Sequence, residues 1–212
     1  MACADPWYAQ IIDRYGLEYA KIAGYFEEDK PFSTTYAEHF NLPQDEVVVQ
    51  FSGAFHPFHQ GHLDSVLTAI LTLQQWYRRL HTVIHVDHIS YRGSKGECPD
   101  WRCDEGLGLV ARLPGKVTIV REDDMPDGCS RNFTRLYGEL CSRNQGKVYC
   151  VSGGDRANYA LTFRDKGRCL ISGRDGHPNY EKYRFLDKND KDTTMFLPGT
   201  HPASSTQIRA SL

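Results

Sequence analysis

Gly53-Ala54-Phe55-His56-Pro57-Phe58-His59-Gln60-Gly61-His62 is the stretch that decides the fold class of this chain. An apolar run at residues 47–51 precedes it, and an apolar-periodic stretch at residues 63–76 follows it. The order is therefore a buried strand, a glycine turn and a helix, which is the order in which α/β proteins build a phosphate site. We expect this stretch to lie at the carboxyl end of a strand in a parallel sheet.

Apolar runs and amphipathic stretches alternate along the rest of the chain. We expect strands at residues 47–51, 81–88, 116–121, 147–151, 168–171 and 194–197. We expect helices at residues 60–78, 102–113, 130–143, 156–163 and 204–212. This alternation predicts an α/β fold with a doubly wound parallel sheet and right-handed crossovers. In such sheets ligands bind beyond the carboxyl ends of the strands.

Residues 1–45 are interpreted as an N-terminal helical extension, and residues 46–212 as the main domain. Within the extension, apolar residues recur at spacings of three and four, at Tyr8, Ile12, Tyr15, Tyr19, Ile22 and Phe26. They share one face of a helix, which favours packing against the outside of the main domain. Because the spacing is also heptad-like, self-association into a homo-oligomer is the alternative.

Composition sets bounds on the partners and the setting of the chain. A formal net charge of −2 over 212 residues gives no overall attraction to nucleic acid or to a membrane surface. Seven scattered cysteines without a preceding leader predict a reduced, cytoplasmic setting. The closest cysteine pair, Cys98 and Cys103, lacks further zinc ligands at a matching spacing. No dense carboxylate cluster marks a permanent metal site either, so we name no metal ligand.

The glycine turn and its two histidines form the first candidate phosphate site. Gly53 permits a sharp turn, and the helix that follows offers unpaired amides and the positive end of its dipole. His59 and His62 are three apart, so they share one side of the first turn and can donate hydrogen bonds to phosphate oxygens. Gly61 between them leaves the surface open. We assign phosphate binding to the backbone of the turn and helix start at Gly53, Ala54, Phe55 and Gly61.

A second candidate phosphate site lies near the end of the sequence. Ser204 is a suitable helix N-cap, and Ser205 and Thr206 add hydroxyls and amides at the same helix mouth. Arg209 lies one turn farther, so the group forms a polyphosphate clamp. Taken alone, an ordinary capped helix explains these residues equally well. Neither a lysine-bearing P-loop nor a Gly-x-Gly-x-x-Gly turn occurs in the sequence, which disfavours kinase and hydride-transfer chemistry.

Three further segments provide candidate residues for a second substrate. Gly154 and Asp155 follow the fourth expected strand, where the carboxylate suits either ribose hydroxyls or a simple helix cap. Arg174 follows the fifth strand and places a guanidinium at the same edge. An aromatic and basic loop suits either a flat ring bearing a phosphate or a mobile loop with solvated charges, and its residues are Lys95, Trp101 and Arg102.

The two phosphate motifs resemble those of the nucleotidyltransferase superfamily of Rossmann-like α/β-phosphodiesterases. The signature Gly-x-Phe-x-Pro-x-His-x-Gly-His matches residues 53–62, and Ser-Ser-Thr-x-Ile-Arg matches residues 204–209. The resemblance covers about residues 46–212. It implies that a phosphate of the second substrate attacks the α-phosphorus of ATP or CTP and that pyrophosphate leaves. It also implies Mg²⁺, bound mainly through the substrate phosphates.

The resemblance further implies roles for individual residues. His59 and His62 would stabilise the transferring α-phosphate, while Arg209 and the serines would hold the departing pyrophosphate. The Gly-x-Asp at residues 153–155, the Arg-x-Gly at residues 174–176 and the pair Trp101-Arg102 are similar to those of nicotinamide/nicotinate mononucleotide adenylyltransferases. The acceptor is then a pyridine mononucleotide. The alternatives are a phosphopantetheine, glycerol-phosphate or choline-phosphate acceptor, or a non-catalytic nucleotide-binding regulatory module.

Overall fold

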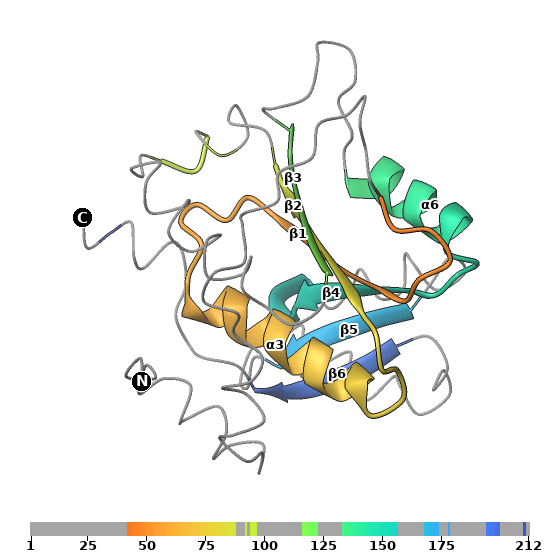
Figure 1. Ribbon diagram of the computed structural model, residues 1–212. Helices are drawn as coiled ribbons and strands as arrows, with labels where there is room; N and C mark the ends of the chain where they lie inside the picture. Colours follow the sequence, from red (N-terminus) through yellow and green to blue (C-terminus); the bar gives the residue numbers. More distant parts are fainter. Residues whose placement is uncertain are drawn as a thin grey trace, which may run out of the picture.

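A six-stranded, all-parallel sheet forms the centre of the protein (Figure 1). Its strands, in spatial order, are β3 (Lys116–Arg121), β2 (His81–Val86), β1 (Val48–Gly53), β4 (Val148–Gly153), β5 (Arg168–Gly173) and β6 (Thr194–Gly199). The computed structural model describes residues 42–87, 92, 94–96, 116–122, 133–156, 168–173, 178, 194–199 and 210. The strand order changes direction between β1 and β4, which is where open α/β sheets form their ligand crevice.

Helices cover both faces of the sheet. Helix α3 (Gln60–Gln74) and helix α6 (Phe133–Arg143) bury their apolar sides in two separate core clusters. Val49 lies in the α3 cluster and its neighbour Val48 lies in the α6 cluster, because successive strand residues point to opposite faces. The prediction of an α/β fold with a parallel sheet is confirmed.

Four strands run two residues farther than the sequence pattern predicts. The expected ends coincide with the last apolar residue, but β1, β4, β5 and β6 each continue to a glycine. In β1, β4 and β5 the two added residues are serine and glycine. The hydrogen bonds between strands continue beyond the last apolar residue. Three neighbouring strands, β1, β4 and β5, therefore end with small side chains at the carboxyl edge of the sheet.

Helix α3 is four residues shorter than the predicted 60–78. It ends at Gln74, and Trp76 and Tyr77 still bond through their backbone N–H groups to the Leu73 carbonyl. Tyr77 then turns toward the sheet, where its hydroxyl makes a 2.8 Å hydrogen bond to that of Tyr149. The chain therefore reaches the sheet within three residues of the end of α3.

Several predicted elements lie outside the described residues. These are the helix at 102–113, the helix at 156–163 beyond Arg156, the helix at 204–212 apart from Ala210, and the extension up to residue 41. Asp155 and Arg156 lie in a short 3-10 turn, η3 (Gly154–Arg156), that directly continues β4. None of the described helices has the length and apolarity needed to cross a bilayer.

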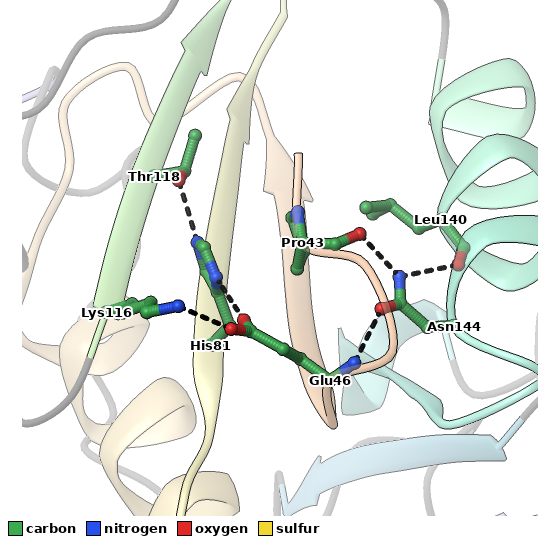
Figure 2. A network of polar contacts seen from close by, with 7 residues as sticks. All are labelled: Pro43, Glu46, His81, Lys116, Thr118, Leu140 and Asn144. Carbon is green, nitrogen blue, oxygen red and sulfur yellow. Dashed lines mark hydrogen bonds and ion pairs between the residues drawn. The ribbon is translucent and has the colours of Figure 1, made fainter. Parts of the chain in front are cut away.

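A polar network joins the amino ends of the three strands β1, β2 and β3 (Figure 2). The Glu46 carboxylate accepts a 2.7 Å hydrogen bond from His81 Nδ1 and a 2.5 Å bond from the Lys116 ammonium. The Asn144 side chain donates to the carbonyls of Pro43 and Leu140 and accepts from the Glu46 N–H. The network therefore fixes the chain that enters β1 against α6 and the neighbouring strands.

The Glu46 carboxylate gives this network a pH dependence. Burial opposes its ionisation, but the hydrogen bonds from Lys116 and His81 outweigh burial and lower the pKa of Glu46. A lowered pKa in the folded state stabilises the protein above the unfolded pKa, and this contribution is lost as the pH falls through the folded value. We expect wild type to exceed Glu46→Gln in stability by at most about 1 kcal/mol at pH 6, because solvent screens the pair.

That stability gap should shrink as the pH is lowered from 6 to 3. Urea unfolding of both proteins at several pH values measures it. A gap that stays constant across this range would contradict the role of the Glu46 carboxylate.

Candidate functional site

The turn between β1 and α3 is built around buried aromatic rings. Phe55 is only 3% exposed and has a left-handed backbone with φ of 43°. Its ring contacts the rings of Phe51 at 5.1 Å, Phe58 at 5.1 Å and His62 at 5.0 Å between centroids. A Cβ at Gly53 would meet the Phe55 ring at 3.2 Å, so glycine lets the turn close over the aromatic rings.

The two histidines of the turn stack on each other at the start of α3. Their ring centroids are 3.6 Å apart with an interplanar angle of 22°. His59 Nδ1 accepts a hydrogen bond from the Gly61 N–H at 3.1 Å, and His62 Nδ1 accepts one from the His59 N–H at 3.3 Å. The imidazoles thus replace the serine and glutamate of a capping box. Because both Nδ1 atoms are acceptors, each ring carries a proton on Nε2.

A pair of buried hydroxyls seats the first turn of α3 on the sheet. The Ser65 hydroxyl donates to the Gly61 carbonyl at 2.8 Å, and the Ser172 hydroxyl of β5 donates to Ser65 Oγ at 2.7 Å. Ser65 and Ser172 are 5% and 1% exposed, so water does not compete with these bonds. The mouth of α3 is therefore held at the carboxyl ends of the strands.

The carboxyl end of β4 contributes a carboxylate to the same edge. Asp155 is exposed, and a Cβ at Gly153 would lie 2.6 Å from its Oδ1. Glycine at 153 is therefore needed for the carboxylate to fold back over the strand end. Asp155 lies in η3, directly after the strand that pairs with β1, and Gly154 beside it is buried.

His56 connects the turn to the segment that contains Lys95. The His56 ring is buried, and its Nε2–H donates a 2.8 Å hydrogen bond to the Gly96 carbonyl. Lys95 is half-buried, and its backbone N–H bonds to the Arg92 carbonyl at 3.0 Å. Lys95 was predicted to bind the second substrate. The hydrogen bond from His56 to its neighbour Gly96 brings it beside the turn that was predicted to bind phosphate. The His56 side chain had no predicted role.

The described part of the chain thus brings together many of the predicted site residues. They lie in the β1–α3 turn, in the 3-10 turn after β4 and in the segment bonded to His56: Gly53, Ala54, Phe55, His59, Gly61, His62, Gly154, Asp155 and Lys95. The others lie outside the described residues: Trp101, Arg102, Arg174, Ser204, Ser205, Thr206 and Arg209. The convergence of Arg209 on the two histidines stays a prediction.

A cluster of His85, Asp87 and Glu122 at the carboxyl ends of β2 and β3 was missed by the sequence analysis. One potential metal-ligand atom from each of these residues lies within 4.8 Å of the other two. Burial raises the pKa of Asp87, and the Glu122 charge raises it further, while His85, Arg156 and Lys95 act in the opposite direction. In the sequence, only a His-x-Asp at the end of β2 and a glutamate directly after β3 hint at this cluster.

Comparison of the chain with models of known protein families gave no match, and comparison with curated proteins gave none either. The geometry and chemistry of the residues described above are therefore the basis on which a function is inferred.

Proposed function

We propose that this protein is a nucleotidyltransferase that moves AMP from ATP to the phosphate of a pyridine mononucleotide, either NMN or nicotinate mononucleotide. Pyrophosphate leaves, and a dinucleotide of the NAD type forms. The fold is then the nucleotidyltransferase form of the Rossmann-like sheet, with residues 1–45 as a helical extension. The observation that carries the proposal is the stacked pair of His59 and His62 at the mouth of α3, directly beyond β1.

The chemistry of this pair suits a reacting phosphate. Each ring presents an Nε2–H donor because each Nδ1 is used to cap the helix. The amides of the first turn and the positive end of the helix dipole add to the attraction for an anion. Donors fixed in advance stabilise charge that develops in the transition state without first reorganising.

The reaction needs alignment more than proton transfer. An oxygen of the acceptor phosphate, already an anion, forms the new bond to the α-phosphorus of ATP. The bond from the α-phosphorus to the bridging oxygen breaks, and that oxygen leaves with pyrophosphate. Holding the two substrates in line supplies much of the rate acceleration. Part of the charge is neutralised by Mg²⁺ that enters bound to the substrate phosphates, so we assign it no protein ligand.

We assign the second substrate, the mononucleotide, to Lys95 and Asp155. The ammonium of Lys95 suits the phosphate of the mononucleotide, and the Asp155 carboxylate suits ribose hydroxyls. Trp101, Arg102 and Arg174 complete the proposed acceptor site, and Ser204, Ser205, Thr206 and Arg209 the proposed triphosphate clamp. We further propose a cytoplasmic enzyme whose partners are ATP and this small molecule.

Pyrophosphate release tests the proposal directly. The purified chain is incubated with Mg²⁺ and ATP or CTP, together with NMN, nicotinate mononucleotide, phosphopantetheine, glycerol phosphate or choline phosphate. We expect release only with ATP and a pyridine mononucleotide. Release with another acceptor would favour another transferase of the same superfamily. Tight ATP binding without release in any mixture would favour a regulatory module.

Arg209→Ala tests whether Arg209 binds the same ATP molecule as the two histidines of the β1–α3 turn. If the guanidinium holds the β- and γ-phosphates, its removal should weaken ATP binding or slow pyrophosphate departure by about tenfold or more. Titration with a non-hydrolysable ATP analogue and steady-state kinetics in both substrates measure these effects. A change confined to the KM of the acceptor would place Arg209 away from the triphosphate.

A further inference from the structure

His85, Asp87 and Glu122 lie on the face of the sheet opposite to α3. Val83 belongs to the core cluster under α6, and His85 and Asp87 follow it at intervals of two. In the pairing of β2 with β3, His85 stands opposite Val120. Continuing that register by two residues sets Glu122 beside Asp87. All three residues therefore share one face, at the carboxyl ends of two neighbouring strands.

Within the described part of the chain, one nitrogen of the His85 ring has no hydrogen-bond partner. The side chain is fully buried, and its Nε2 lies 3.1 Å from Glu122 Oε1. The unpartnered atom is Nδ1, which is also buried. A buried polar atom without a hydrogen bond destabilises the fold, so this one requires an explanation.

A second histidine on the same strand provides an internal comparison (Figure 2). His81 bonds through both ring nitrogens, to Glu46 Oε2 at 2.7 Å and to Thr118 Oγ1 at 2.8 Å. The Lys116 ammonium also neutralises its carboxylate partner. That group is complete without a ligand. At His85, by contrast, Nε2 faces the Glu122 carboxylate, and Nδ1 has no hydrogen-bond partner among the described residues.

The spacing of the three side chains also suits a cation. Ligand atoms bonded to a common ion at about 2.1 Å stand roughly 3–4 Å apart. The 4.8 Å limit on the cluster is close to that spacing, so modest side-chain shifts would close it around an ion.

We propose that His85, Asp87 and Glu122 bind one divalent transition-metal cation. One imidazole nitrogen with two carboxylate oxygens suits Mn²⁺ or Zn²⁺, whereas Mg²⁺ and Ca²⁺ prefer oxygen ligands alone. Three protein ligands leave coordination positions for water or for a phosphate oxygen of a ligand. These ligands lie on the face of the sheet opposite to α3, and we expect them to bind the ion without nucleotide.

Mn²⁺ is the probe for the test, since the cysteines of the chain would compete for Zn²⁺. The untagged chain, freed of metal with a chelator, is titrated with Mn²⁺ in the absence of nucleotide, and free Mn²⁺ is measured by electron paramagnetic resonance. We expect one bound ion, retained in equimolar Mg²⁺, and a spin-echo modulation from an imidazole nitrogen. Asp87→Asn and Glu122→Gln should each raise the Kd by at least the roughly 10–100-fold that loss of a residue supporting a ligand costs.

Glu46→Gln is the matched control. It removes the carboxylate that is bonded to His81, at the other end of β2 from His85. It should bind Mn²⁺ as wild type does. Thermal unfolding without metal shows whether the Asp87 and Glu122 variants remain folded. The inference is overturned if wild type binds no Mn²⁺ without nucleotide, or if both variants bind it as tightly as wild type. Since nucleotide is absent, neither result bears on the transferase proposal.

Discussion

His62→Asn is expected to lower the rate of dinucleotide formation by a factor on the order of 10² or more. The substitution removes the Nε2–H that we assign to the α-phosphate in the transition state. ATP affinity should change little, because this donor acts mainly on charge that develops during the reaction. Steady-state kinetics with ATP and NMN, together with binding of an ATP analogue, measure the two effects separately.

The choice of asparagine separates catalysis from helix capping. His62 Nδ1 accepts the His59 N–H, and the asparagine amide oxygen can accept the same bond. We therefore expect His62→Asn to unfold close to the wild-type temperature, whereas His62→Ala loses the cap at a cost of about 1 kcal/mol. Both variants should lose activity alike. Near-normal turnover in His62→Asn would remove His62 from the reaction.

Leu67→Ala should have the largest effect on stability of the changes considered. Leu67 is fully buried between α3 and the sheet, so its loss leaves a cavity and should cost about 3 kcal/mol. Leu71, one turn later on the same helix, is only partly buried and is the matched control. Leu71→Ala should cost clearly less. Urea unfolding of the two variants measures the difference, and equal losses would contradict the assigned packing of α3.

The strands of the sheet were largely predictable from the sequence. Each expected strand is present, since buried parallel strands are continuous apolar runs that stand out from their surroundings. The start of α3 was also predictable, because a glycine turn and two histidines mark it. Placement of His59 and His62 at that helix start is confirmed, although their role as reciprocal caps was not foreseen.

Features that depend on register or on distant contacts were not predictable. Nothing local to His85 shows that Glu122 will stand near it, because that neighbourhood follows from the pairing of β2 with β3. The bond from His56 to the Gly96 carbonyl joins residues forty apart in the chain. The hydrogen bond between the hydroxyls of Tyr77 and Tyr149, just past the end of α3, likewise joins residues distant in the sequence.

The Ser172 hydroxyl donates to Ser65, and the Ser65 hydroxyl donates to the Gly61 carbonyl. These two hydrogen bonds hold the first turn of α3 against strand β5. Any anion that docks at this helix mouth meets donors that already stand in place. Little of its binding free energy is then spent on ordering the backbone.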